Sequence, residues 1–457
     1  MNRKNPLLTA FAAAVIVAIF VLFIAQGLAY FSWNDGKPLT GLVAQGQYSR
    51  SILNLANPVF YVAAAVFFAV LGAVIYIGFK FHDKEDLETA DEIPHQQHGK
   101  TWAEISWTVA PAVVLLVVGL ATVVTLGELN SAAADDAVEV RVEGQQWWWK
   151  FSYDSNRNGT FGDDGDIVTA NEMVIPAGTD IALSQTSNDV IHSFWIPALN
   201  GKKDAVPGMI TDWKLKADEP GVYRGQCTEF CGLSHANMRM LVRSVSPQDF
   251  GTWQSNQLKA AKKPAAGSKE AAGEAIFKGQ LCSSCHLIRG VSDAEVSDPE
   301  SGVKRQLVSG VAPDLTHFAT RGTFSGSIFN SRYPDPEGKT NVPFGQTCKV
   351  TGLAGTSSLG LGGGTLDPAA LQALPPCPEP NQTDAKDIPW AAGTGNPDNP
   401  PNNVVLAAWL RNPPALKPMV PEPDANPVAD GRRRGMPNLQ LTEEQIDQLV
   451  AYLNSLS

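Results

Sequence analysis

Three long apolar runs constrain the fold of this chain most strongly, because a helix needs about 20 apolar residues to cross a bilayer. They cover residues 7–30, 57–79 and 105–127. The second and third runs predict two transmembrane helices. The first run follows two basic residues and has small residues at Gly27 and Ala29. Residues 1–30 therefore fit either a cleaved signal peptide or a retained first helix.

The basic residues near these runs predict how the chain lies in the membrane. Arg3 and Lys4 precede the first run, and the loop at 80–101 contains three further lysines. Positively charged loops stay on the cytoplasmic side. The two-helix hairpin at 48–130 therefore leaves everything after residue 130 outside, including all six cysteines. Disulfides are stable in that compartment.

Residues 131–257 predict an all-β domain. Short alternating or β-branched runs such as AVEVRVEG and EMVIPAGTDIALSQT are separated by Gly, Pro and Asp turns. A sandwich or Greek-key barrel is the expected architecture. The loop at 154–166 begins like a calcium-binding EF-hand, but Gly165 stands where that loop needs a bidentate glutamate. This difference favours a solvated hairpin.

One short segment of the β domain carries a cluster of soft metal ligands. The stretch QCTEFCGLSHANM contains Cys227, Cys231, His235 and Met238. Two thiolates, an imidazole and a thioether suit copper in electron transfer, and His192, 35 positions upstream of Cys227, is a candidate for a second nitrogen ligand. A zinc site, which has little use for a thioether, and a structural disulfide are the two alternatives.

The composition changes after residue 257. Residues 258–272 form an Ala/Lys/Gly-rich linker, and Cys282, Cys285 and His286 then follow in GQLCSSCHLIRG. In an exported segment, C-x-x-C-H indicates covalent attachment of a c-type haem. Both cysteines would hold the porphyrin through thioethers, and His286 would be the proximal ligand of the iron.

The chain ends in a predicted amphipathic helix. Thr442 and Gln445 have the spacing of a capping box. Four apolar residues of one face follow, namely Ile446, Leu449, Val450 and Leu453.

The residues from about 48 to 250 resemble subunit II of the haem–copper cytochrome c oxidases. The motifs that carry the resemblance are HGKTWAEISWTVAP at 98–111, GQQWWWKFSY at 144–153, HSFWIPALNGKKDAVPGM at 192–209, and the cysteine-containing segment. The resemblance implies a transmembrane hairpin followed by a cupredoxin domain with a binuclear copper centre. One departure is Met209, where many members of the family carry Arg after Pro-Gly.

The resemblance also implies individual roles at the copper centre. Cys227 and Cys231 would bridge two copper ions, and His192 and His235 would each complete one of them. The remaining ligands would be Met238, as a weak axial ligand, and the backbone carbonyl of Glu229. In the family the side chain of this glutamate also faces a magnesium ion at the boundary with subunit I.

Two further roles follow from the family pattern. Trp147 would be the exposed entrance for electrons from cytochrome c, with Trp148 and Trp149 in packing roles. Glu104, at the cytoplasmic start of the third apolar run, would lie at the mouth of a proton channel. The alternative is that Glu104 only caps the end of the helix at the membrane interface.

The segment from 268 to 457 resembles a class I cytochrome c, which implies an all-α domain at 273–457. Pro313 would pack against the His286 ring and orient it through its carbonyl. Met436 would be the sixth ligand of the iron, with Met419 as its rival. A Pro/Gly-rich insert at about 330–402 departs from small cytochromes c. It contains Cys348 and Cys377, for which we expect a disulfide, with two free thiols as the alternative.

Together these patterns predict a multi-domain membrane protein with a transmembrane α-hairpin, an all-β cupredoxin domain and an all-α cytochrome c domain. The resemblance implies an electron-transfer subunit of a proton-translocating cytochrome c oxidase, multi-pass in a bacterial plasma membrane. Its partners would be subunit I, other oxidase subunits and a donor, either cytochrome c or quinol–cytochrome c reductase; none is a nucleic acid. The alternative is a membrane-anchored electron-transfer protein without an oxidase partner.

The charges of the two outer domains predict how they would meet. Residues 131–257 carry 10 basic and 17 acidic side chains, a net charge of −7, and residues 268–457 carry 15 and 20, a net charge of −5. Two domains of like sign are not steered together by net charge. Tethering, with an effective concentration on the order of millimolar, is therefore expected to bring them together.

Overall fold

The computed structural model describes the chain in several stretches. They are residues 39–81, 99–163, 165–292, 295–297, 304–306, 312–331, 401, 403–417, 419 and 435–457. The expected signal peptide or helix at 1–30, the cysteine pair Cys348 and Cys377, and nearly all of the insert at 330–402 lie outside the described residues. The chain divides into two compact units, residues 1–37 with 50–131, and residues 38–49 with 132–457. Each is described by itself.

Two long helices dominate the first unit. Helix α2 spans Gln47–Lys80 and helix α3 spans Thr101–Asn130. At about 1.5 Å per residue, both exceed the roughly 30 Å of a hydrocarbon core. They are apolar enough to cross a membrane and leave large side chains such as Leu115 and Val124 exposed. The hairpin predicted from the apolar runs is therefore confirmed as two membrane-spanning candidates.

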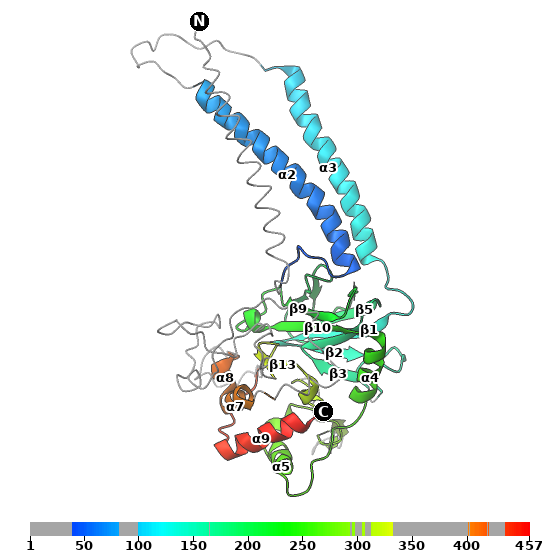
Figure 1. The fold of residues 1–457 in the computed structure, drawn as a ribbon, viewed down its shortest axis with the longest axis vertical. Helices are drawn as coiled ribbons and strands as arrows, with labels where there is room; N and C mark the ends of the chain where they lie inside the picture. The colour runs from blue at the N-terminus through cyan, green and yellow to red at the C-terminus, as the bar shows by residue number, and fades with distance from the viewer. Residues whose placement is uncertain are drawn as a thin grey trace, which may run out of the picture. The chain divides into compact units, whose positions relative to one another are not determined.

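The second unit begins with a β domain (residues 132–257) built from two sheets, coloured cyan to green in Figure 1. One sheet has the order β3-β2-β1-β5-β8 and the other the order β4-β10-β9. The strands of the first are β1 Val138–Gln145, β2 Trp148–Tyr153, β3 Ile167–Ala170, β5 Ile181–Ser187 and β8 Thr211–Leu215. The second contains β4 Glu172–Pro176, β9 Gly221–Gln226 and β10 Arg239–Val245, and a short hairpin pairs β6 His192–Phe194 with β7 Lys203–Ala205. The all-β prediction is confirmed for this part of the chain.

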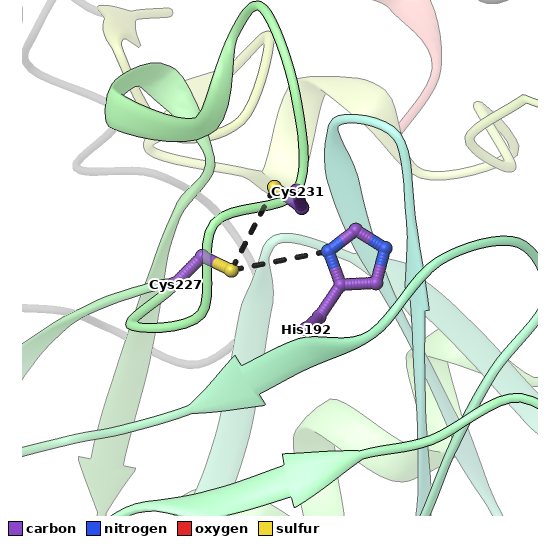
Figure 2. A group of neighbouring side chains, drawn as sticks. All are labelled: His192, Cys227 and Cys231. Atoms are coloured by element: carbon purple, nitrogen blue, oxygen red, sulfur yellow. Dashed lines mark hydrogen bonds between the residues drawn. The ribbon is translucent and has the colours of Figure 1, made fainter.

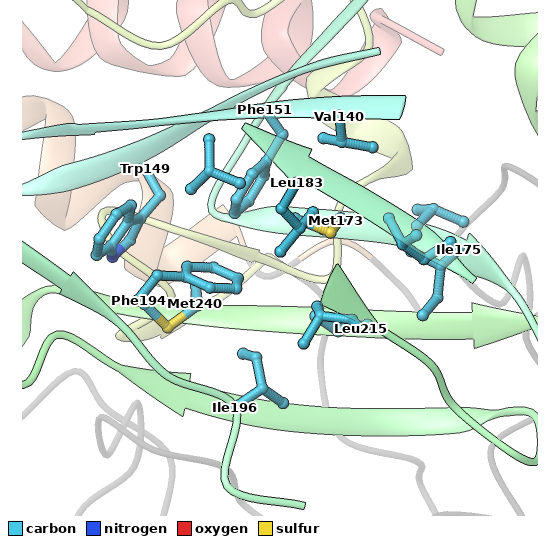
Figure 3. Packing of buried hydrophobic residues seen from close by; sticks show 14 of the residues in the cluster. Val140, Trp149, Phe151, Met173, Ile175, Leu183, Phe194, Ile196, Leu215 and Met240 are labelled. Atoms are coloured by element: carbon cyan, nitrogen blue, oxygen red, sulfur yellow. The ribbon is translucent and has the colours of Figure 1, made fainter. Parts of the chain in front are cut away.

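The core of the β domain lies between the two sheets (Figure 3). In strand β5, buried and half-buried residues alternate along the sequence IALSQTS. Successive side chains of a strand point to opposite faces of its sheet, so one face of β5 points into this core. Trp149 and Phe151 of β2 pack edge-to-face against Phe194 of β6. Buried aromatic side chains of this size contribute much of the packing energy of a core. Helix α4, Pro247–Gln257, ends the domain, which the all-β prediction did not anticipate.

Helices are the main regular elements in the described part of the C-terminal segment (residues 258–457). Its helices are α5 Lys269–Gly279, α7 Asn403–Arg411, α8 Pro413–Leu416 and α9 Glu443–Ser455. Short 3-10 turns occur at Leu281–Ser284 (η3) and Phe318–Thr320 (η4). Strand β11 Glu295–Ser297 pairs with β12 Lys304–Gln306. Strand β13 Thr323–Phe324 pairs with β14 Phe329–Asn330.

Helices α5 and α9 cross closely in this segment. A Cβ atom at Gly273 would lie 2.2 Å from the Gln448 carbonyl oxygen and 2.6 Å from the Tyr452 Cβ, so only glycine permits this contact. The capping box of Thr442 and Gln445 is present at the start of α9. The four apolar residues predicted for one face of α9 are all buried, so the prediction for this helix is confirmed.

Candidate metal centre

The cysteine-containing segment connects two paired strands of the β domain. Strand β9 ends at Gln226 and β10 begins at Arg239, and the antiparallel pairing of these two residues fixes both ends of the loop. Within it, residues His235–Asn237 form a short 3-10 turn. The backbone N–H of Cys227 donates to the Met238 carbonyl at 2.9 Å. The loop is therefore held rigidly by the strands that carry it.

The predicted ligands in this loop converge with His192 of β6, and His192, Met238 and both cysteines are buried. The Cys227 and Cys231 sulfurs lie 3.9 Å apart, and His192 Nδ1 lies 3.8 Å from the Cys227 sulfur (Figure 2). On the other side, His235 Nδ1 is 3.5 Å and the Met238 sulfur 3.8 Å from the Cys231 sulfur. The Glu229 carbonyl oxygen lies 3.3 Å from the Cys227 sulfur. The other five predicted ligands are separated from His192 by 35 or more residues of chain, and the fold brings them together.

The arrangement suits bridging sulfurs better than a disulfide. A disulfide needs about 2.05 Å between its sulfurs, whereas these lie 3.9 Å apart. Each sulfur has one imidazole on its outer side, His192 for Cys227 and His235 for Cys231. A thioether and a carbonyl oxygen add one weak donor on each side. Soft sulfur and imidazole donors of this kind are typical of copper sites in electron transfer.

A carboxylate that sequence reasoning missed holds His192 in place. Asp189 Oδ1 lies 2.8 Å from His192 Nε2, and Asp189 Oδ2 accepts from the Gln146 N–H at 2.7 Å. The pair is fully buried, and the histidine ring also lies against Gly144, where a Cβ would be 2.6 Å from the ring. The bond to Asp189 leaves Nδ1 directed toward the sulfurs. The sequence signal was Asp189 itself, three positions before the ligand.

Burial and hydrogen bonding shift the pKa values of these groups. The hydrogen bond between the two sulfurs is the largest influence on both thiols, and it lowers the pKa of Cys227 and raises the pKa of Cys231. Burial alone would lower the pKa of His192, but its hydrogen bonds to Asp189 and Cys227 outweigh burial and raise it. In the metal-free centre Cys227 is therefore the thiol that loses its proton more readily.

Trp147 differs from the sequence expectation. Its indole Nε1 donates to the Cys231 carbonyl at 3.0 Å, and Gln146 Nε2 donates to the same oxygen at 2.7 Å. Trp147 thus adjoins the centre, as expected. Its side chain is only 5% exposed, however, whereas an entrance for an external protein should be open. Trp148 and Trp149 are buried in the predicted packing roles.

The C-x-x-C-H motif forms a tight turn in the C-terminal segment. The backbone N–H groups of Cys285 and His286 both donate to the Cys282 carbonyl. His286 Nδ1 lies 2.8 Å from the Pro313 carbonyl oxygen, which is the contact predicted for this proline. With Nδ1 occupied, Nε2 is the ring nitrogen that remains for a metal. Burial lowers the pKa of His286, which favours the neutral, metal-binding form.

The other predicted site residues are placed as follows. Glu104 lies in the first turn of α3, and Met419 belongs to the buried core of the β domain. Met436 packs against the core that contains Cys282 as well as against the β-domain core. In the loop at 154–166, the Asp154 carboxylate accepts from the Asn158 and Gly159 N–H groups, and Asp163 accepts from Asn158 and Thr160. Donors within the loop thus engage these carboxylates.

Comparison with known proteins gives matches to one family over both the helical hairpin and the β domain. Residues 138–245 match the family described as "Cytochrome C oxidase subunit II, periplasmic domain", and residues 43–124 match its "transmembrane domain" counterpart. A relative named cytochrome c oxidase subunit 2 from Alkalihalophilus pseudofirmus is 31% identical over 298 residues, which cover 64% of this chain and 77% of the relative. The chain belongs to the cytochrome c oxidase subunit II family.

Two further members share this part of the chain. Cytochrome c oxidase subunit 2 of Arabidopsis thaliana is 30% identical over 226 residues, 46% of this chain and 85% of the relative. The crystal structure of the periplasmic domain of subunit II of cytochrome oxidase from Bradyrhizobium japonicum is 30% identical, covers 28% of this chain and 96% of that one, and has a TM-score of 0.25.

Family membership establishes the broad function of the chain. It is a subunit of a cytochrome c oxidase, a haem–copper oxidase that also contains other subunits. Two apolar helices anchor a β domain of the periplasmic subunit II type, and that domain implies copper binding.

Proposed function

We propose that this chain is a subunit II with a fused cytochrome c domain, which takes electrons through its C-terminal segment and delivers them through the β domain to subunit I, where oxygen is reduced to water with proton pumping. The proposed domains are a signal peptide or helix at 1–30, a hairpin at 48–130, the copper domain at 131–257, a linker at 258–272 and the cytochrome c domain at 273–457. The bound metals supply the one-electron chemistry.

The observation that carries the copper assignment is the pair of sulfurs 3.9 Å apart with one imidazole beside each. Cys227 and Cys231 would bridge the two ions, His192 and His235 would each complete one, and Met238 and the Glu229 carbonyl would be weak ligands. Because strands β9 and β10 and the Asp189 hydrogen bond hold these donors, the centre would change little on oxidation or reduction. A small structural change favours rapid electron transfer.

The observation that supports the haem is the orientation of His286. Its Nδ1 is bound by the Pro313 carbonyl, so its Nε2 would ligate the iron while Cys282 and Cys285 hold the porphyrin. Met436 would be the sixth ligand. Its packing against the core that includes Cys282, together with the burial of Met419 in the β-domain core, favours Met436 over its rival.

Exposed apolar side chains next to the copper ligands support an oxidase partner. Phe230, which precedes Cys231, is 78% exposed, and Ile191, which precedes His192, is also exposed. Exposed apolar side chains on a rigid loop favour contact with the surface of another protein, which would here be subunit I. The Glu229 side chain would face magnesium at that boundary, and Glu104 would serve the proton channel.

Cys348 and Cys377 would form a disulfide. The donor would be cytochrome c or quinol–cytochrome c reductase, and the location a bacterial plasma membrane.

Axial ligation of the haem tests the fused-domain proposal. In the purified oxidase, Met436→Ala should abolish the sulfur-to-iron charge-transfer band and lower the haem potential, because a thioether ligand raises that potential. Met419→Ala is the matched control and should keep the band. Loss of the band in the control alone would show that Met419 is the ligand. A C-terminal peptide without a covalent haem, found by mass spectrometry, would contradict the proposal.

A further inference from the structure

A short hairpin of the C-terminal segment rests directly on the β domain. This docking hairpin (residues 322–331) contains β13, a tight turn and β14. Its turn contacts the metal loop, because a Cβ at Gly326 would lie 2.7 Å from the Asn237 carbonyl oxygen and 3.2 Å from the Trp147 carbonyl oxygen. Gly326 has a φ of 76°, which also requires glycine. The Gly326 carbonyl in turn accepts from the Arg239 N–H at 3.1 Å.

A buried carboxylate joins the hairpin to the β domain. Glu172, at the start of β4, is 2.8 Å from Arg243 Nη2 of β10. The same carboxylate accepts from the Gly322 N–H at 3.1 Å, the Thr323 N–H at 2.5 Å and the Thr323 hydroxyl at 2.7 Å. Three of these four donors belong to the docking hairpin. A desolvated carboxylate needs such donors, so the hairpin completes a site that the β domain leaves partly unsatisfied.

A second polar contact joins the C-terminal segment to the backbone of Trp147. Lys417 Nζ donates to the Trp147 carbonyl at 2.7 Å and to the Ser325 carbonyl at 3.1 Å. Lys417 is buried, and so is Met419, which packs in the β-domain core. Trp409 and Met436 pack against the cores of both the β domain and the C-terminal segment. These shared residues join the two cores, and Trp147, the expected electron entrance, belongs to the β-domain core.

We propose that Glu172 is a docking latch that fixes the hairpin over Trp147 and closes the copper domain to diffusing protein donors. The occupant of this surface is the chain's own C-terminal segment. Electrons then reach Trp147 only from within the chain, and an external donor meets the C-terminal segment first. The electron-transfer part of this inference rests on the proposed function. The latch itself rests on hydrogen bonds among residues that are not predicted metal ligands.

Hydrogen–deuterium exchange on the complete oxidase tests the latch independently of activity. Glu172→Ala should raise the exchange of the Gly322 and Thr323 amides about tenfold or more, because hydrogen bonds to charged groups are strong. Exchange in β1 should not change, which shows that the β domain is folded. Glu143→Ala, which removes an ion pair with Lys150 inside the β domain, is the matched control. Unchanged hairpin exchange in Glu172→Ala would overturn the latch.

A second variant covers the case in which Glu172→Ala fails to fold. Lys417→Met keeps the Glu172–Arg243 pair and should still increase exchange around Ser325.

Anaerobic mixing with reduced soluble cytochrome c then tests closure. In the wild type, haem reduction should precede copper reduction, whereas the latch variants should gain a direct copper phase. Direct copper reduction in the wild type would overturn closure. If the chain carries no haem, the proposed function fails, while the exchange result still decides the latch.

Discussion

At the scale of single residues, the structure separates what spacing can predict from what it cannot. One short loop contains four of the predicted ligands, namely Cys227, Cys231, His235 and Met238. Their close spacing was enough to predict that the side chains converge, and they do. Asp189 was missed because an aspartate near a histidine has many possible partners. Trp147 was expected to be exposed from the family pattern, yet it is buried, because no local sequence pattern shows which distant residues bury a side chain.

Asp189 provides a first prediction at this scale. Asp189→Asn should weaken copper binding about 10- to 100-fold, because the partner of a ligating histidine fixes its ring and its tautomer. Competition with a chelator would measure the affinity. Asp204→Asn, in the exposed middle of strand β7, is the control and should bind copper like the wild type. Equal affinity in both variants would show that Asp189 does not orient His192.

The protonation of the thiols provides a second prediction. The raised pKa values of Cys231 and His192 mean that the metal-free centre keeps protons that copper must displace. Protons compete best at low pH, so the apparent copper affinity should rise with pH, about tenfold per pH unit for each proton released. Cys227, whose pKa is lowered by its hydrogen bond with Cys231, should contribute least to this slope near neutrality. Calorimetry in buffers of different ionisation enthalpy counts the protons. An affinity independent of pH would contradict the assignment.

At the scale of elements, local pattern was a good guide and long-range pairing was not. The apolar runs gave α2 and α3, the alternation in IALSQTS gave β5, and the capping box gave the start of α9. The docking hairpin was not predicted, because Glu172 and Thr323 are 151 positions apart and the hairpin has only short strands. Helix α4 was missed because it follows directly on a run of strands.

A buried tyrosine between the two sheets gives the prediction at this scale. The Tyr153 hydroxyl of β2 donates to the Val174 carbonyl of β4 at 2.9 Å and accepts from the Val174 N–H at 2.8 Å. Tyr153→Phe leaves both buried groups without this partner and should lower the free energy of unfolding by about 1–3 kcal/mol. Tyr223→Phe, which loses one bond to the Glu219 carbonyl, should cost less. Denaturant midpoints of the copper absorbance would compare them, and equal midpoints would refute the bridging role.

At the scale of the whole molecule, direct contact replaces the simple tethering that the charges predicted. Both outer parts are net negative, so long-range attraction does not bring them together. The structure instead shows buried, specific contacts at Glu172 and Lys417 and a shared apolar core. Contacts of this kind depend on the fold of both parts, and composition and net charge carry no information about them.

The central claim is that a binuclear copper centre in this chain relays every electron to subunit I. Low-temperature electron paramagnetic resonance of the purified oxidase, together with its oxygen consumption, tests this claim most directly. Cys227→Ser should abolish the mixed-valence copper signal and the turnover while the spectrum of the proposed c haem stays intact, because one of the two cysteine sulfurs is lost and the C-terminal segment is unchanged. An unaltered copper signal, or full turnover without that signal, would contradict the account.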